Sequence, residues 1–100
     1  MDITISSRNV VLSDSLVSAT KRKVNRLGRF DRAALRADVH FSHEPTRSTA
    51  DCEVCEVVLA GADHRLHSRA AAGDGFTAVD RAVAKLQQQL DRVKARSTLR

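Results

Sequence analysis

The sequence predicts an α+β fold of order β-α-β-β-β-α, with a four-stranded, mainly antiparallel sheet and two helices packed on one face. Two patterns lead to this prediction. Apolar residues recur at helical spacing in two separate segments, and elsewhere they alternate at the two-residue period of strands. Apolar positions run from Ile3 to Leu99 without a linker, and 100 residues suit one hydrophobic core. We therefore expect a single domain over residues 1–100.

The first strand and the first helix are expected within residues 2–28. Ile3 and Ile5 alternate with polar neighbours, which predicts a strand over residues 2–7. Ser13 or Asp14 can cap the helix that follows, and Gly28 is expected to end it. The buried stripe of this helix consists of residues three or four positions apart: Leu16, Val17, Thr20 through its methyl group, Val24 and Leu27.

Three strands are expected between residues 35 and 70. The second strand stops at Glu44-Pro45 and buries one residue in two: Leu35, Ala37, Val39 and Phe41. The third spans residues 51–60, and its imperfect alternation suggests a bulge. The fourth lies between turns at residues 61–63 and 73–75 and turns three polar residues outward: Arg65, His67 and Arg69.

A long second helix, capped by Asp74, is expected from residue 76 onward. Its apolar stripe is the clearest in the chain: Phe76, Val79, Val83, Leu86, Leu90 and Val93. All three phenylalanines, Phe30, Phe41 and Phe76, are expected in the core. No aromatic side chain should then be free to stack on nucleotide bases.

Charge is segregated along the sequence. The chain carries a formal net charge of +5, and 13 of its 17 Lys and Arg residues lie in residues 21–36 and 81–100. Six of the 12 acidic residues lie in residues 38–63. A basic surface of this kind favours a polyanionic partner.

Both predicted helices carry a cationic stripe. The first places Arg22, Arg26 and Arg29 on one side, flanked by Lys21 and Lys23. The second helix repeats the arrangement with a stripe of Arg81, Lys85, Arg92 and Arg96. Gln88 and Gln89 are interleaved with this stripe, and Asp80 and Asp91 are the only acids of the helix. One such stripe can be plain solvated surface. Two on the same sheet face repel each other unless a polyanion screens them, which points to phosphate.

Metal, catalytic and membrane functions are not expected. Three pairs have i, i+3 spacing, His40/His43, Cys52/Cys55 and His64/His67. On a strand such side chains leave opposite faces, so we expect no metal site, no disulfide, and cysteines that serve packing. No nucleophile or phosphate-loop motif is present, which predicts no enzyme, cofactor or small-molecule substrate. No segment approaches the roughly 20 apolar residues of a membrane span, and no signal peptide is visible, so a cytoplasmic location is expected.

Three segments carry recognisable motifs: residues 3–16 (ITISSRNVVLSDSL), 23–27 (KVNRL) and 74–94 (DGFTAVDRAVAKLQQQLDRVK). They resemble the ribosome-hibernation family that includes hibernation-promoting factor and protein Y. In order, they span nearly the whole chain. Phe76 replaces a tyrosine found in many relatives, and Arg26 replaces a lysine.

The resemblance implies a β-α-β-β-β-α protein that binds 16S rRNA in the decoding region of the small ribosomal subunit. It would overlap the mRNA channel and the A and P tRNA sites, inhibit translation, and preserve idle ribosomes under stress or in stationary phase. The rRNA contacts it implies are Lys23, Arg26, Lys85, Gln89, Arg92 and Arg96. Arg22 and Arg29 are added from the stripe on the first helix.

Besides a plain interaction module or a metal-dependent redox protein that uses Cys52, Cys55 and the histidines, two alternatives stay open at the level of sequence. Long family members carry a C-terminal domain that pairs two ribosomes, so the chain is either a short form or an N-terminal fragment, and pairing is expected only if such a domain is missing from it. A double-stranded RNA-binding domain has a related α-β-β-β-α layout and recognises RNA shape and phosphates. The additional first strand and the long last helix argue against that second alternative.

Overall fold

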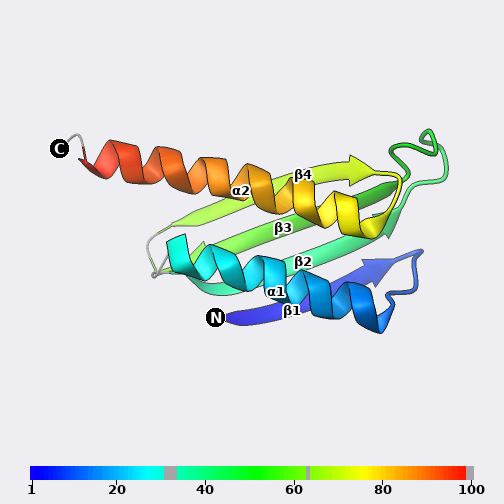
Figure 1. Cartoon of the computed structure of the whole chain (residues 1–100), viewed down its shortest axis with the longest axis horizontal. Helices are drawn as coiled ribbons and strands as arrows, with labels where there is room; N and C mark the ends of the chain where they lie inside the picture. Colours follow the sequence, from blue (N-terminus) through cyan, green and yellow to red (C-terminus); the bar gives the residue numbers. More distant parts are fainter. Residues whose placement is uncertain (31–33, 63, 99–100) are drawn as a thin grey trace.

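The computed structural model describes residues 1–30, 34–62 and 64–98 and confirms the predicted order of elements (Figure 1). The six elements are β1 (Asp2–Arg8), α1 (Asp14–Phe30), β2 (Ala34–His43), β3 (Glu53–Gly61), β4 (Arg65–Ala72) and α2 (Gly75–Thr98). Both helices lie on the same face of the sheet, and the other face is open. The predicted α+β architecture is thus confirmed.

The sheet has the order β1-β2-β3-β4 and is mainly antiparallel, as predicted. β1 pairs with β2 in parallel because α1 carries the chain back between them. The other two pairs are antiparallel hairpins, joined by a loop of residues 44–52 and a tight turn in which the Gly61 amide donates to the His64 carbonyl at 2.9 Å. Asp63 of the predicted turn lies outside the described residues.

The core lies between the sheet and the two helices. Alternate residues of β2 and β3 point into it, and so do residues three or four apart on each helix. Its largest fully buried side chains are Leu27, Leu59, Leu86, Val24, Val39, Val57, Val79, Thr20 and Cys55. The Ser68 hydroxyl donates to the Ala82 carbonyl at 2.8 Å, which joins β4 to α2 inside this core.

Both predicted helix caps are present. Ser13 Oγ accepts from the Leu16 amide at 3.1 Å, and Asp74 Oδ1 accepts from the Thr77 amide at 2.8 Å. A Cβ at Gly75 would lie 2.8 Å from Leu16 Cδ2, so the absence of a side chain lets α2 begin directly against α1.

The C-terminal end of α1 differs from the prediction. The helix continues past Gly28 to Phe30, and Gly28 does not adopt the left-handed conformation that ends many helices. Leu27 is fully buried in the same turn. Its packing outweighs the low helix propensity of glycine, which costs about 1 kcal/mol.

The predicted bulge lies on a different strand. Residues of β3 pair regularly with β4 from Glu53 to Ala60, whereas the pairing of β2 shifts between Ala34 and Arg36. Leu35 therefore leaves the buried side and is 61% exposed, so its assignment to the core was wrong. The imperfect alternation of β3 arises because Val54 is buried on the open face.

The ends of the apolar stripe of α2 are more exposed than predicted. Phe76 is 42% and Val93 40% exposed, so their assignment to the core was wrong, whereas Phe41 is buried as predicted. The helix is about 36 Å long from its 24 residues. The neighbouring strand β4 is about 27 Å long from its 8 residues, so the helix ends extend beyond the sheet. The side chain of Phe30 lies outside the described residues.

Candidate nucleic-acid interface

The arginines of α1 form an exposed cationic cluster. Arg22, Arg26 and Arg29 are exposed, and within the described part of the chain none of them has an ion pair or hydrogen bond. Together with Asn25 they line a hollow of about 380 Å³. Guanidinium groups bind phosphate oxygens through two parallel hydrogen bonds, so three of them around one hollow can hold a sugar-phosphate backbone.

Lys23 lies on the flank of α1 that faces α2. Its Nζ is 2.5 Å from Asp80 Oδ1, and only 21% of its side chain is exposed. This ion pair joins the two helices and compensates the charge of Lys23. The structure therefore separates Lys23, which was predicted to flank the stripe, from the three uncompensated arginines of the stripe itself.

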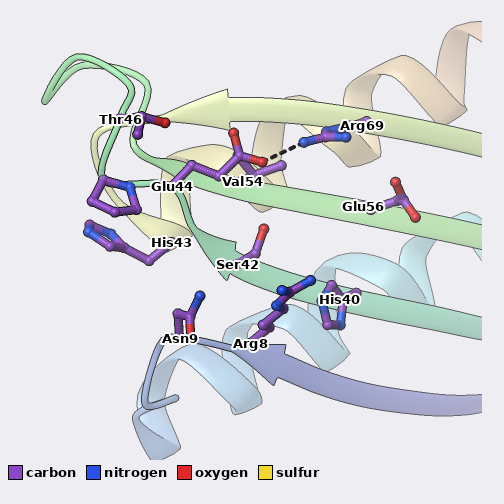
Figure 2. A pocket seen from close by; sticks show the side chains of 11 residues that line it. Arg8, Asn9, His40, Ser42, His43, Glu44, Thr46, Val54, Glu56 and Arg69 are labelled. Atoms are coloured by element: carbon purple, nitrogen blue, oxygen red, sulfur yellow. Dashed lines mark hydrogen bonds and ion pairs between the residues drawn. The ribbon is translucent and has the colours of Figure 1, made fainter.

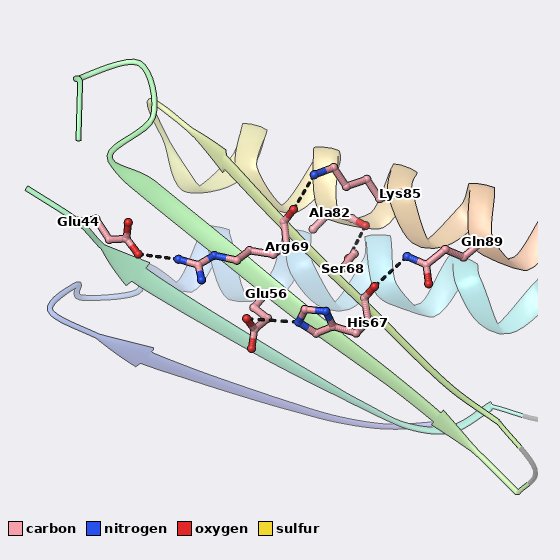
Figure 3. Close-up of polar contacts among 8 residues, drawn as sticks. All are labelled: Glu44, Glu56, His67, Ser68, Arg69, Ala82, Lys85 and Gln89. Atoms are coloured by element: carbon pink, nitrogen blue, oxygen red, sulfur yellow. Dashed lines mark hydrogen bonds and ion pairs between the residues drawn. The ribbon is translucent and has the colours of Figure 1, made fainter. Parts of the chain in front are cut away.

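The cationic stripe of α2 lies along the edge of the sheet. Three side chains one helical turn apart, Arg81, Lys85 and Gln89, donate to backbone carbonyls of β4, at distances of 2.8, 2.7 and 2.8 Å. Figure 3 shows the bonds of Lys85 and Gln89. Their acceptors are alternate residues of the strand: Ala71, Arg69 and His67. Four residues of a helix rise about 6 Å and two residues of a strand about 6.8 Å, so the spacing of the donors on α2 matches the spacing of the acceptors on β4.

These hydrogen bonds give the stripe of α2 a structural role. β4 is an edge strand, and its outward carbonyls would otherwise have water as their only partner. Lys85 is exposed and keeps two further N–H donors for a ligand. Arg92 is exposed and, in the described residues, has no partner, whereas the side chain of Arg96 lies outside them.

The two stripes do not form one continuous cationic surface. Lys85 and Gln89 lie over the edge at β4, while the flank of α2 that faces α1 carries Asp80. The structure thus brings Arg22, Arg26 and Arg29 together and keeps them apart from the predicted residues of α2. A single ligand that contacts both stripes must reach across α2.

The open face of the sheet is mixed in charge. Arg69 Nη2 lies 2.7 Å from Glu44 Oε1, and His67 Nε2 lies 3.3 Å from Glu56 Oε2 (Figure 3). Arg36 is likewise paired with Asp38, at 3.4 Å. The predicted outward direction of the β4 arginines is confirmed, but acids oppose the basic groups here.

A second hollow, of about 450 Å³, lies on this open face at the base of the loop 44–52 (Figure 2). Arg8 and Arg69 line it together with Glu44 and Glu56. Acids within the hollow oppose a phosphate group, so the cluster on α1 is the stronger candidate for a nucleic acid.

The two cysteines differ in environment, and both are free thiols. Cys55 is fully buried, as expected for a packing residue, and burial together with the nearby Glu56 carboxylate raises its pKa to about 12. Cys52 precedes β3 and is half-exposed, so its predicted place on the strand was wrong. Its thiol donates to the Thr49 carbonyl at 3.5 Å.

Sequence reasoning missed the ladder along β4. The four-residue spacing of Arg81, Lys85 and Gln89 was visible, but which strand forms the sheet edge follows only from the sheet order.

No helix in the described residues is long and apolar enough to cross a membrane.

The sequence matches one protein family over residues 3–98, the family described as Sigma 54 modulation protein / S30EA ribosomal protein. The chain belongs to this family. Its members are non-enzymatic, ribosome-associated proteins, in agreement with the prediction that the chain is not an enzyme. The resemblance noted from three sequence segments is thereby confirmed.

Individual relatives agree with this assignment. The ribosome hibernation promotion factor of Mycobacterium tuberculosis is 32% identical over 96 residues, which are 95% of this chain and 44% of that protein. The chain thus spans less than half the length of this relative.

Two solved structures share the fold. A ribosomal subunit interface protein from Coxiella burnetii matches with a TM-score of 0.81 and 20% identity, over 95% of this chain and 99% of its own. The N-terminal domain of Thermus thermophilus Protein Y matches with a TM-score of 0.77 and 24% identity, over 93% of this chain and 99% of its own.

Proposed function

We propose that this chain is a ribosome-hibernation domain that binds 16S rRNA in the decoding region of the small subunit. Bound there, it blocks mRNA and tRNA, inhibits translation, and preserves idle ribosomes in the cytoplasm during stress or stationary phase. The observation that carries the proposal is the uncompensated cluster of Arg22, Arg26 and Arg29 around a hollow on a member of a ribosome-associated family.

The chemistry of the interface follows from charge. The three α1 arginines engage backbone phosphates and release the counterions condensed on the RNA, which supplies affinity without sequence preference. Lys85 and Gln89 add contacts at the β4 edge, and Arg92 and Arg96 add contacts from later positions of α2. The scarcity of exposed aromatic groups favours recognition of folded RNA by shape and phosphate over stacking on single-stranded bases.

Residues 1–100 act in this proposal as one ribosome-binding unit without a cofactor or a small-molecule substrate. The relative from M. tuberculosis is more than twice as long as the matched region. Pairing of two ribosomes is proposed only where a further domain accompanies this one.

A double-stranded RNA-binding module is less well supported. It has no counterpart of β1, which here pairs over seven residues in parallel with β2. That function also does not explain why the last helix has 24 residues and follows the edge of the sheet.

Sedimentation of ribosomal particles tests the proposal. Small subunits, large subunits and a short RNA duplex are each mixed with the protein at equal RNA concentration, and the bound fraction is measured in a sucrose gradient or by filtration. We expect the protein to sediment with small subunits and to compete with mRNA and tRNA for them. Tight binding to the duplex with no preference for the small subunit would favour the rival function.

A further inference from the structure

The loop between β2 and β3 brings three metal-binding side chains together at its base. His43 is the last residue of β2, Glu53 is the first residue of β3, and the two are paired directly in the sheet. Cys52 immediately precedes Glu53. One ligand atom from each, an imidazole nitrogen, a thiol sulfur and a carboxylate oxygen, lie within 4.8 Å of one another. We propose that these three residues bind a zinc ion.

The donor set favours zinc over calcium or magnesium. A thiolate and an imidazole are typical ligands of zinc and other first-row transition metals, whereas calcium and magnesium prefer oxygen. Around a tetrahedral zinc ion, donor atoms at bond lengths of about 2.0 to 2.3 Å are about 3.5 Å apart. The observed donor atoms lie within 4.8 Å of one another. The most distant of them must therefore approach by about 1 Å to reach the spacing around zinc, a shift that rotation of side chains can supply.

The contact between His43 and Glu53 already brings two of the donor atoms together. His43 Nδ1 donates to Glu53 Oε1 at 2.6 Å, a short hydrogen bond. A zinc ion placed between these atoms replaces the shared proton and separates them by about 1 Å to reach the donor spacing of zinc. The Cys52 thiol loses its proton at the same time, so binding releases protons and strengthens as pH rises.

The backbone holds the three donors in place, and solvent can reach them. The Glu44 amide donates to the Cys52 carbonyl at 2.7 Å and closes the loop 44–52 across its base. The side chains of His43 and Glu53 are 37% and 20% exposed, and Cys52 is also half-buried. His43 stands at the end of β2 where the chain enters the loop (Figure 2).

Neighbouring groups of the same types are excluded from the site. Glu44 is engaged by Arg47 and Arg69. Cys55 is fully buried in the core, out of reach of an ion that enters from solvent. Three protein ligands leave a fourth position open to water or to a group of a partner.

The sequence led us to expect no metal site because each i, i+3 pair of histidines or cysteines was considered separately. His40 and His43 diverge along β2, where His40 Nδ1 lies 2.9 Å from Ser6 Oγ on β1. Cys55 is buried in the core, whereas Cys52 lies in the loop before β3 and is half-exposed. The proposed site takes one member from each pair, His43 and Cys52, and the antiparallel register of β2 and β3 brings them together.

Cobalt(II) titration of the metal-free protein without a histidine tag tests the site. Cobalt bound by a thiolate gives an intense charge-transfer absorption band, and zinc displaces the cobalt. We expect one ion per chain. Cys52→Ser should abolish the band, and His43→Gln and Glu53→Gln should weaken zinc binding more than about 100-fold, since loss of an outer-shell partner alone costs 10- to 100-fold.

Cys55→Ala and His40→Gln are the matched controls, and both should keep the band. Zinc should raise the melting temperature of the parent protein and of both controls but not of Cys52→Ser. Circular dichroism of Cys52→Ser checks that the variant folds. Absence of the band in the folded parent protein, or its loss in Cys55→Ala together with its retention in Cys52→Ser, would overturn the proposal. Ribosome binding is measured separately, since the α1 arginines take no part in the metal site.

Discussion

Replacement of the three α1 arginines by glutamine should reduce the salt dependence of small-subunit binding. Arg22, Arg26 and Arg29 have no acidic partner in the described structure, so each is free to neutralise one phosphate. Each neutralised phosphate contributes about 0.7 to 0.9 to the slope of log affinity against log salt concentration, so the triple variant should lose about 2 to 3 units of slope. Between about 50 and about 200 mM salt, the parent protein should then lose roughly 20- to 40-fold more affinity than the variant.

The assay is equilibrium binding of labelled protein to purified small subunits across a salt series. The control variant replaces Arg36, Arg65 and Arg69 on the open sheet face and has the same net charge. Two of these arginines already pair with acids, Asp38 and Glu44, so its slope should change little. An equal or larger change of slope in the control would show that the open sheet, or net charge alone, governs binding, and our reasoning about α1 would be wrong.

Three further predictions follow from the contacts of individual side chains. Lys85→Ala and Arg92→Ala should each weaken small-subunit binding, but only Lys85→Ala should also lower the melting temperature, because it removes a hydrogen bond to the edge of β4. Iodoacetamide should alkylate Cys52 in the folded, metal-free protein and leave Cys55 unmodified, because burial raises the pKa of Cys55 to about 12. Asp74→Ala should lower the melting temperature at neutral pH. Hydrogen bonds from Thr77 lower the pKa of Asp74, so its contribution is present above the unfolded pKa of about 3.9 and is lost as pH falls through the lower folded value.

Each of these predictions has a clear contrary result. Equal melting temperatures for the two α2 variants would mean that the bond to β4 contributes nothing to folding. Mass spectrometry that finds Cys55 alkylated as fast as Cys52 would place its thiol outside the core. A melting-temperature difference for Asp74→Ala that does not shrink as pH falls from neutral through the lowered pKa of the Asp74 carboxyl would show that its carboxylate is not the stabilising form.

The order and the faces of the elements could be predicted from sequence because they depend on local periodicity. Hydrophobic spacing of two or about 3.6 residues specifies which side of a strand or helix is buried, and it placed Val39, Val57 and Leu86 correctly. Capping chemistry is local as well, which is why Ser13 and Asp74 were identified. The three α1 arginines form one stripe for the same reason, since positions three and four apart share a helix face.

The failures occurred where distant parts of the chain decide the outcome. Leu35 and Phe76 follow the apolar pattern, but a shift of strand pairing and the end of the sheet leave them exposed. Local spacing carries no information about register or about the length of a neighbouring element.

The sequence by itself determined the fold class, the family and a basic surface on the first helix. Only the tertiary structure decided which basic groups are free to bind. By sequence Lys23 flanks the stripe of Arg26 and Lys85 shares a stripe with Arg92. In the structure Lys23 pairs with Asp80, and Lys85 uses one of its three N–H donors on the edge of β4. The physical reason is that a partner within hydrogen-bonding distance compensates a charge or occupies a donor, and such partners come from segments far away in the chain.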